Sequence, residues 1–301
     1  MSEIQFGSDY SWIVLDSDQM HQNPQIYQDY QLDEEIIAYA LDENERAHMD
    51  YNPETRDLLV IYNVLNLTMD DNHYETVPIT FVAQEKRLLT ITNQKNNYVV
   101  NLMAQLLEKR SELTVLTFLF AALTQISMQY FPVIEEMDAN KDRLNRLLRQ
   151  TTTKKNLLAL SDLETGIVYL VTAANQNVLL LEHIKYHHIY HRFNELEKEQ
   201  FEDAMTEARQ LVAMTQLISQ ILSQLSGTYN NVLNNNLNDN LTLLTIISIL
   251  LAVIAVITGF FGMNVPLPFT KDKSAWLYII LISLVLWVII AQFLKWIVRK
   301  R

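Results

Sequence analysis

Two long uncharged stretches near the carboxyl end dominate the pattern of hydrophobic and polar positions. Residues 241–261 (LTLLTIISILLAVIAVITGFF) and 276–294 (WLYIILISLVLWVIIAQFL) contain no charged side chain over 21 and 19 residues. A helix of about 20 apolar residues crosses the hydrocarbon core of a bilayer, which is roughly 30 Å thick. The pattern therefore predicts two transmembrane helices, in preference to two buried helices of a soluble core.

The residues that flank these stretches predict their orientation. The segment after the second stretch carries Lys295, Arg299, Lys300 and Arg301, whereas the connecting loop, residues 265–274, has two lysines and one aspartate. Because basic flanking segments stay on the cytoplasmic side, we expect both chain ends in the cytoplasm and the loop outside. The sequence thus predicts a multi-pass protein of the plasma or inner membrane.

The first hundred residues show shorter apolar runs separated by turn residues. These runs predict strands at residues 12–15, 58–64, 76–82 and 88–92. The turn sequence Asn52-Pro53-Glu54-Thr55 lies between residues 45–51 and 58–64 and predicts a hairpin. We expect a cytoplasmic α/β domain over residues 1–120.

Helical spacing of apolar residues follows in the middle of the chain. We expect a helical hairpin region over residues 121–193, with breaks at Thr151–Thr153 and near Gly166. Asn194 and Glu197 have the spacing of a capping box, so a new helix is predicted to begin there.

The new helix has no strong stop before Gly259 and would be roughly 100 Å long at 1.5 Å per residue. We expect a stalk helix that continues into the first membrane helix over residues 194–264, with 241–261 in the bilayer. An external loop (265–274), a second membrane helix (275–295) and a basic tail (296–301) complete the chain. A helix of this length needs partners along it, so we predict an oligomer.

Composition and charge exclude several classes of function. The net charge is −12, and residues 1–240 carry 17 basic and 34 acidic groups, which argues against nucleic acid as a partner and suits cations. The chain has no cysteine, and its five glycines form no nucleotide-binding loop. We find no pairing of a nucleophile with a base, and so expect neither an enzyme nor an organic cofactor.

A stripe of small or polar residues follows the first predicted membrane helix at spacings of three and four. Its members are Asn238, Leu241, Thr245, Ser248, Ala252, Ala255, Gly259 and Gly262, and only Leu241 is neither small nor polar. Small residues let membrane helices pack closely, and they could equally line a central path between symmetry-related helices. The pattern alone leaves both interpretations open.

The end of this helix carries a recognisable tripeptide. Gly262, Met263 and Asn264 follow two phenylalanines and precede Val265-Pro266. In this position, at the outer end of the first of two carboxyl-terminal spans, the tripeptide resembles the Gly-Met-Asn signature of the CorA family of divalent-cation channels. The resemblance extends over the whole chain.

The resemblance implies an α+β membrane protein that assembles as a funnel-shaped homopentamer. In such an assembly the first membrane helix lines the pore, the second forms an outer ring, and the tripeptide is the selectivity filter. Some family features differ here. Phe261 replaces a tyrosine, Val253 and Ile254 stand where many members have a proline, and the loop has a single acid, Asp272.

The chemistry of Mg²⁺ fits such a filter. Mg²⁺ holds its water ligands strongly, and a ring of five Asn264 amide oxygens can accept hydrogen bonds from those waters without removing them. Leu241 and Leu244 could form a hydrophobic constriction near the cytoplasmic face. We expect passive uptake driven by the membrane potential, because the spans contain no ionisable residue to couple protons.

Cytoplasmic Mg²⁺ is also an expected regulatory ligand, because the resemblance implies acidic ion sites between subunits. Asp203 is the best candidate for such an acid, with Glu202 and Glu207 nearby. A solvated acidic helix face would give the same pattern.

Histidines form a weaker pattern. His183, His187 and His191 have the spacing of one helix face, beside His188, and pairs of this kind can bind zinc. They are more often ordinary packing or surface residues.

Alternative functions remain alongside an Mg²⁺ channel, for which Co²⁺ and Ni²⁺ are further candidate substrates. One is a zinc transporter of the same family, and another is a membrane-anchored scaffold or sensor that does not conduct ions.

Overall fold

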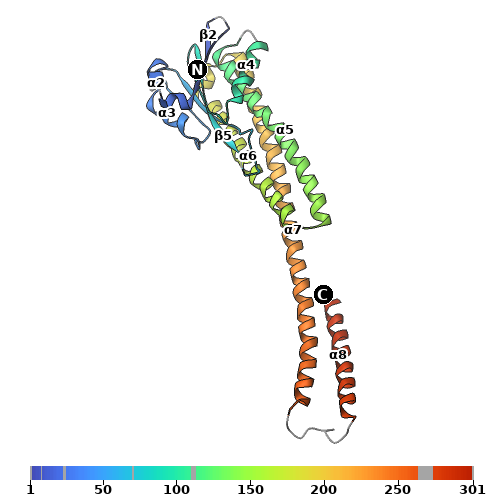
Figure 1. The fold of residues 1–301 in the computed structure, drawn as a ribbon. Helices are drawn as coiled ribbons and strands as arrows, with labels where there is room; N and C mark the ends of the chain where they lie inside the picture. Colours follow the sequence, from blue (N-terminus) through green and yellow to red (C-terminus); the bar gives the residue numbers. More distant parts are fainter. Residues whose placement is uncertain are drawn as a thin grey trace. The chain divides into compact units, whose positions relative to one another are not determined.

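The computed structural model describes residues 2–7, 9–22, 25–69, 71–109, 113–263 and 274–299 (Figure 1). These residues form two compact units, one that ends at Gly227 and one that begins at Thr228. A single helix, α7 (Glu195–Phe261), contributes to both units.

A six-stranded mixed sheet forms the centre of the first unit. Its strands are β1 (Ser2–Phe6), β2 (Tyr10–Asp16), β3 (His48–Tyr51), β4 (Leu58–Leu65), β5 (Thr76–Ala83) and β6 (Arg87–Thr92). The spatial order is β1-β2-β6-β5-β4-β3, and the pair β2–β6 is parallel while the other pairs are antiparallel. The predicted strands are confirmed, and β1 was not predicted.

The predicted hairpin joins β3 and β4. Tyr51 pairs with Leu58, and the turn closes through hydrogen bonds from Asn52 N to Asp57 O (3.0 Å) and from Arg56 N to Asn52 O (2.8 Å). Arg56 has a φ of 65°, so the turn places a non-glycine residue in the left-handed region.

Short helices cover one face of the sheet. They are α1 (Ser17–Gln22), α2 (Gln25–Asp29) and α3 (Glu34–Leu41), and Figure 1 shows α2 and α3 on the side of the sheet away from α4. Met20, Ile26 and Ile36 from these helices share a buried cluster with alternate residues of β2, among them Ile13 and Leu15. The period of two along a strand explains why these residues share one face.

Longer helices cover the other face. These are α4 (Tyr98–Lys109), α5 (Val115–Gln150) and α6 (Lys154–Tyr186). Trp12 is fully buried there, donates a hydrogen bond to Thr90 Oγ1 (3.0 Å) and packs edge-on against Phe118 of α5. The predicted division between residues 120 and 121 falls within α5, and residues 1–227 form one compact unit because α5 packs against the sheet.

The helical region differs from the prediction at one glycine. The break at Thr151–Thr153 is confirmed, but Gly166 lies inside α6 and is buried. A Cβ atom at Gly166 would lie 3.4 Å from the backbone nitrogen of Tyr74. At this position α6 packs against the segment before β5, and the added Cβ would be in ordinary van der Waals contact with it.

The amino end of α7 is fixed by the predicted capping box. Glu197 N donates to Asn194 Oδ1 and Asn194 N donates to Glu197 Oε2, both at 2.9 Å. Glu197 also accepts a hydrogen bond from Thr114, the N-cap of α5, at 2.8 Å. The starts of α5 and α7 are thus joined by one carboxylate, and the 3₁₀ helix η1 (His188–Arg192) connects α6 to α7.

The first part of α7 runs antiparallel to α6. Arg209 pairs with Glu182 (2.9 Å), and seven residues further along α7, Gln216 donates to Asn175 (3.4 Å). The face that packs into the first unit is apolar at helical spacing and includes Phe201, Ala204, Ala208, Leu211, Ile218 and Leu222.

The second unit consists of the rest of α7 and the helix α8 (Ala275–Arg299). Among the described residues, four helices are long and apolar enough to cross a membrane. The apolar window of α5 is 67% buried and that of α6 is 33% buried, whereas those of α7 and α8 are 0% buried. Burial inside the first unit accounts for much of the hydrophobicity of α5, whereas the described residues bury none of the apolar windows of the two carboxyl-terminal helices.

Candidate ion pathway in the carboxyl-terminal helices

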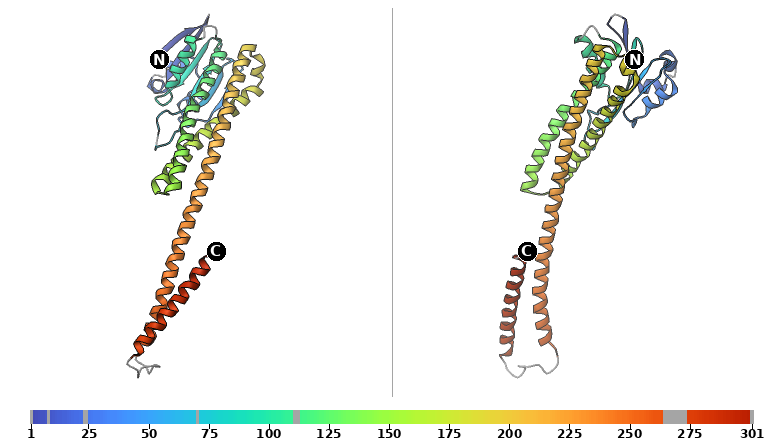
Figure 2. Two further views of the ribbon diagram at one scale, coloured as in Figure 1. Left: turned by 90° about the vertical axis from the view of Figure 1, so that its right-hand side faces the viewer. Right: turned by 180° about the vertical axis from the view of Figure 1, so that it is seen from behind.

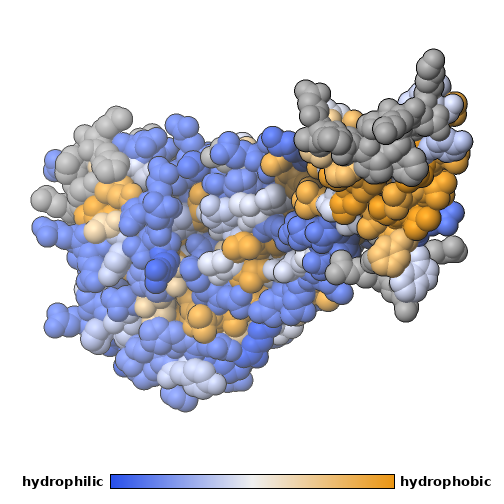
Figure 3. Space-filling model, turned by 90° about the horizontal axis from the view of Figure 1, so that it is seen from below, coloured by the Kyte–Doolittle hydropathy of each residue, from blue (hydrophilic) through white to orange (hydrophobic). Residues whose placement is uncertain are grey.

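Hydrophobic side chains cover most of the surface of the second unit. In the view of Figure 3, hydrophobic side chains gather in one region of the molecule, and the rest of that view is mainly hydrophilic with smaller hydrophobic patches. Exposed leucines, isoleucines and aromatic residues follow both α7 and α8, for example Leu251 at 62% and Leu281 at 62%. An apolar surface of this extent is expected to contact lipid or other copies of the chain.

One face of α7 in this unit is partly covered. Its members are Ile246, Leu250, Val253, Ile257 and Phe261, which recur at spacings of three and four. On α8 the partly buried positions include Ile279, Ser283, Ile290 and Leu294, again at helical spacing. We infer from this burial that the two faces lie toward each other, and Figure 2 shows α8 beside the last part of α7, diverging from it toward the carboxyl end.

The stripe of small residues lies on the opposite side of α7 from α8. Nine residues correspond to two and a half helical turns, which place a residue on the opposite side of the helix. Five stripe members are nine residues from a partly covered one, in the pairs Ser248–Ile257, Ala252–Phe261, Ala255–Ile246, Gly259–Leu250 and Gly262–Val253. All five stripe members are exposed, as are Asn238, Leu241, Leu244 and Thr245.

The hydroxyl groups of the stripe are satisfied as donors within the helix. Thr245 Oγ1 donates to the carbonyl oxygen of Leu241 at 2.8 Å, and Ser248 Oγ donates to that of Leu244 at 2.9 Å. Each hydroxyl oxygen retains acceptor capacity. The hydroxyl oxygens of the stripe can therefore accept hydrogen bonds from its surroundings while the helix keeps its own hydrogen bonds. A path for hydrated cations would need acceptors of this kind.

The two glycines of the stripe have different local environments. A Cβ at Gly259 would meet nothing within 4 Å, so no contact within the chain explains a glycine there. At Gly262 a Cβ would lie 3.1 Å from the carbonyl oxygen of Thr258, which is a close approach. Among the glycines only Gly7 has a positive φ, so Gly262 is not in the left-handed region.

The predicted filter is described in part. Gly262 and Met263 follow the end of α7, and Met263 is 46% exposed. Asn264 and residues 265–273 of the loop lie outside the described residues, as do residues 300 and 301 of the tail.

Two of the three acidic candidates on α7, Glu202 and Asp203, differ in their contacts, and no contact is described for Glu207. Glu202 accepts hydrogen bonds from Lys185 (2.6 Å) and from Tyr190 (2.9 Å), and the Lys185 ammonium holds the pKa of Glu202 below its ordinary value. Asp203 is exposed and accepts a hydrogen bond from Gln200 at 3.3 Å. Of these two neighbours, Asp203 is the carboxylate without a charged partner in the described part of the chain.

The histidines do not share one helix face, because α6 ends just before His187. His183 is in the last turn of α6, His187 caps it, and His191 lies in η1. The rings of His187 and His188 are 4.1 Å apart and both pack against Tyr51. Burial lowers the pKa of His187, and the neighbouring imidazoles lower it further.

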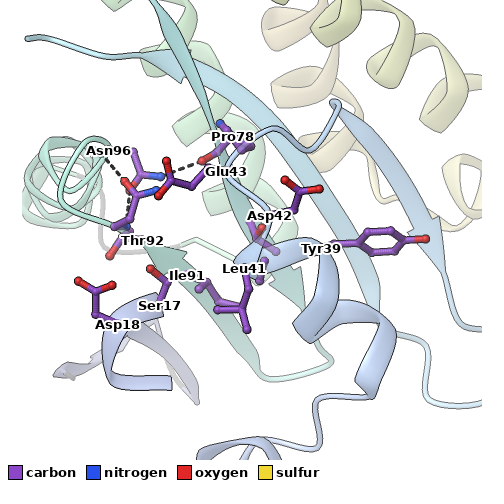
Figure 4. Close-up of a pocket in the computed structure, with 13 residues that line it drawn as sticks. Ser17, Asp18, Tyr39, Leu41, Asp42, Glu43, Pro78, Ile91, Thr92 and Asn96 are labelled. Atoms are coloured by element: carbon purple, nitrogen blue, oxygen red, sulfur yellow. Dashed lines mark hydrogen bonds between the residues drawn. The ribbon is translucent and has the colours of Figure 1, made fainter. Parts of the chain in front are cut away.

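A small pocket of about 80 Å³ lies beside α1 and α3 in the first unit (Figure 4). Its carboxylates belong to Asp18, Asp42 and Glu43, but Glu43 is paired with Lys95 at 3.2 Å, and Asn96 donates to a carbonyl of β5 at 2.8 Å. Over the described residues, no three histidine or acidic side chains are grouped to hold a metal ion. We therefore assign no ion site to this pocket or to the histidines.

A mixed α/β domain that continues through one long helix into apolar, uncovered helices defines a membrane-anchored α+β protein. The model of the family described as CorA-like Mg²⁺ transporter protein matches residues 7–300, so the chain belongs to the CorA family. The resemblance stated from the Gly-Met-Asn signature is confirmed. This is a family of membrane transport proteins, which agrees with the expectation that the chain is not an enzyme.

Solved structures share the fold at low sequence identity. The complete CorA magnesium transporter from Methanocaldococcus jannaschii matches with a TM-score of 0.77 and 19% identity, covering 100% of this chain and 93% of that one. The full-length CmaX protein matches with a TM-score of 0.70 and 16% identity, covering 99% and 90%. The cytoplasmic domain of ZntB from Vibrio parahaemolyticus matches with a TM-score of 0.55 and 11% identity, covering 77% and 90%. No protein of curated function matches this chain in sequence.

Proposed function

We propose that this protein is a channel for Mg²⁺, with Co²⁺ and Ni²⁺ as further candidate substrates. In this proposal Gly262, Met263 and Asn264 form the selectivity filter at the outer mouth, and the amide of Asn264 accepts hydrogen bonds from the waters of the hydrated ion. Membership in a family of Mg²⁺ transporters supports the choice of substrate.

The observation that carries the proposal is the position of the small-residue stripe. It lies opposite the face of α7 that α8 covers, and its hydroxyl oxygens can accept hydrogen bonds. In a ring of copies with α8 outermost, this face would point to the central axis. We therefore propose that Asn238, Leu241, Leu244, Thr245, Ser248, Ala252, Ala255 and Gly259 line the pore.

The assembly that we propose is a homopentamer with two membrane-spanning helices in each protomer and both termini in the cytoplasm. The 0% burial of the apolar windows of α7 and α8 supports the choice of these two helices as the spans. The excess of basic residues after α8 supports the orientation.

The driving force in this proposal is the membrane potential. A divalent ion gains about 4.6 kcal/mol per 100 mV, at about 2.3 kcal/mol per charge. The described parts of the two spans contain no acidic or basic residue between Asp239 and Lys295, so no side chain there is available as a proton relay. Leu241 and Leu244 would form the hydrophobic constriction at the inner end.

Cytoplasmic Mg²⁺ is proposed to favour the closed state through Asp203. This carboxylate is exposed, and within the described residues it faces no cation, so it can contribute to an ion site completed by a neighbouring protomer. Glu202 is less suited to that role because Lys185 already neutralises it.

The second candidate function is transport of Zn²⁺, supported by the fold similarity to the cytoplasmic domain of ZntB. A non-conducting scaffold or sensor is the third, and the scarcity of acidic residues in the loop supports it. Ion flux distinguishes all three.

The experiment is ion uptake into proteoliposomes under an inside-negative potential. Wild type is compared with Asn264→Ala and with Asn235→Ala, a matched change in the exposed, asparagine-rich segment before the first span. We expect potential-dependent Mg²⁺ uptake by wild type and Asn235→Ala that is lost in Asn264→Ala. Uptake of Zn²⁺ alone would replace the first proposal with the second, and a folded oligomer that passes no divalent ion would favour the scaffold.

A further inference from the structure

The turn between α5 and α6 carries a concentration of positive charge in an otherwise acidic unit. Residues 143–161 contain five basic and no acidic side chains, although residues 1–240 contain twice as many acids as bases. The five residues, which we call the basic tip, are Arg143, Arg146, Arg149, Lys154 and Lys155. All five are exposed.

Helix caps on both sides define the backbone of the basic tip. Thr151 N bonds the carbonyl of Leu147 at 2.9 Å and so caps α5, while Thr153 accepts a hydrogen bond from Asn156 N at 3.2 Å and caps α6. Asn156 also donates to the carbonyl of Thr151 at 3.3 Å, which ties the two caps together. The caps therefore keep the ends of α5 and α6, which carry these side chains, close together.

The charges of the basic tip have no partner within the described part of the chain. None of the five takes part in an ion pair there, whereas nearby Lys141 pairs with Asp138 and Asp142. Lys154 and Lys155 occupy the first turn of α6, where the helix dipole disfavours cations and no acid is present. Positions that oppose a local rule in this way are typical of binding surfaces.

Exposed leucines accompany the charges. Leu147 is 42% exposed and lies one turn after Arg143, and Leu158 is 54% exposed and lies one turn after Lys154. Basic residues interleaved with exposed apolar side chains are suited to the interfacial region of a bilayer, where the cations meet headgroups and the leucines enter the acyl boundary.

Within the first unit, α7 runs toward the end that carries the basic tip. Because Arg209 pairs with Glu182 and Gln216 with Asn175, later residues of α7 run alongside earlier residues of α6, toward the basic tip. Gly227 ends the first unit, and thirteen residues separate it from the uncharged run that begins at Leu241. The segment that links the first unit to the predicted span is therefore short in sequence.

We propose that the basic tip docks on anionic lipid headgroups of the membrane in which the protein is inserted. The proposal rests on the membrane insertion and orientation given under "Proposed function", and not on ion conduction. A bilayer is favoured over an acidic protein or a nucleic acid because the anchor keeps its surface at high effective concentration and because the exposed leucines match its apolar layer.

The test uses the absence of cysteine from the chain, since one introduced thiol can be labelled uniquely. Full-length Gln150→Cys carries a fluorophore on the exposed last residue of α5 and is reconstituted in vesicles with headgroup-spin-labelled lipid. We expect quenching at least about twofold stronger with 30% phosphatidylglycerol than with phosphatidylcholine alone. Raising the salt from 0.1 M to 1 M shortens the screening length from about 10 Å to about 3 Å and should remove the difference.

Charge neutralisation supplies the matched comparison. The tip variant carries glutamine at four of the five tip positions, and it should lose the dependence of quenching on anionic lipid; the positions are Arg146, Arg149, Lys154 and Lys155. The control variant carries glutamine at four exposed basic residues elsewhere in the first unit, and it should keep that dependence; the positions are Arg46, Arg56, Arg87 and Lys109. Circular dichroism and the elution volume of the oligomer check folding of both variants.

Equal quenching in the two lipid mixtures, or equal loss in both variants, would overturn the proposal. Uptake of Mg²⁺ by the same vesicles separates the two hypotheses, because docking without flux contradicts only the channel and flux without docking contradicts only the lipid contact. Quenching that is abolished by added RNA or by an acidic peptide at unchanged lipid composition would also contradict lipid as the preferred ligand.

Discussion

The glycine at the outer part of the stripe offers the sharpest test of the pore face. In Gly259→Leu an isobutyl group is added where a Cβ meets nothing within 4 Å in the chain. No clash within the protomer opposes the substitution. If Gly259 faces a central pore, one isobutyl group from each copy would instead crowd the ion path.

The two effects of this substitution have opposite signs. Replacing a glycine inside a helix by leucine stabilises the helix by about 0.5–1 kcal/mol. A loss of flux of at least tenfold corresponds to about 1.4 kcal/mol added to the barrier. We therefore expect a protein that is no less stable than wild type and conducts at most about a tenth of the ions.

The assay combines Mg²⁺ flux into vesicles with thermal unfolding and the mass of the detergent-solubilised oligomer. Gly227→Leu is the matched control, because its Cβ also meets nothing within 4 Å and it lies in the same helix before the span. Unchanged flux in Gly259→Leu would refute the pore assignment. Loss of flux together with loss of the oligomer would assign the stripe to helix packing instead.

The remaining predictions concern the first unit. Asn177 is fully buried and bonds both Asn63 N and Asn63 O at 2.9 Å, so Asn177→Leu should destabilise the unit by about 1–3 kcal/mol in urea unfolding, and a change within error would contradict the role of that pair. The pKa of His187 is lowered below its ordinary 6.5 by burial, so the unfolded state takes up more protons; stability should fall as pH drops below about 6.5, and less steeply in His187→Phe. The pKa of Glu202 is lowered below 4.5 by the Lys185 hydrogen bond, so its contribution to stability should be present above pH 4.5 and be lost as pH falls through the folded-state pKa. Glu202→Gln should therefore lower the melting temperature above pH 4.5 and weaken the dependence of the melting temperature on pH below it.

Several elements could be predicted from patterns of residues that are close together in the chain. The capping box at Asn194 depends on residues three apart, and the break at Thr151–Thr153 on caps that use neighbouring side chains, so both could be predicted. The uncharged stretches and the Gly-Met-Asn signature are likewise contiguous in sequence. Each of these features depends on few residues and no distant partner.

Other features depend on contacts between distant segments. Gly166 looked like a break, but α6 continues through it and the residue is buried beside a segment from a distant part of the chain. The parallel pairing of β2 with β6 joins two segments that are about 75 residues apart in the chain, so no local pattern could predict it. The basic tip was also missed, although its charge run was readable, because the exposure and lack of ion pairs that make it distinctive appear only in the fold.

The same division applies to the ion pathway. The sequence by itself determined that a stripe of small residues follows the first span, because spacings of three and four are a property of one helix. It left open whether that stripe packs against another helix or lines a path. The tertiary structure shows that the partly buried side of α7, which we infer to face α8, carries the large residues. The sequence could not show this, because only the packing of two helices distinguishes one apolar face from another.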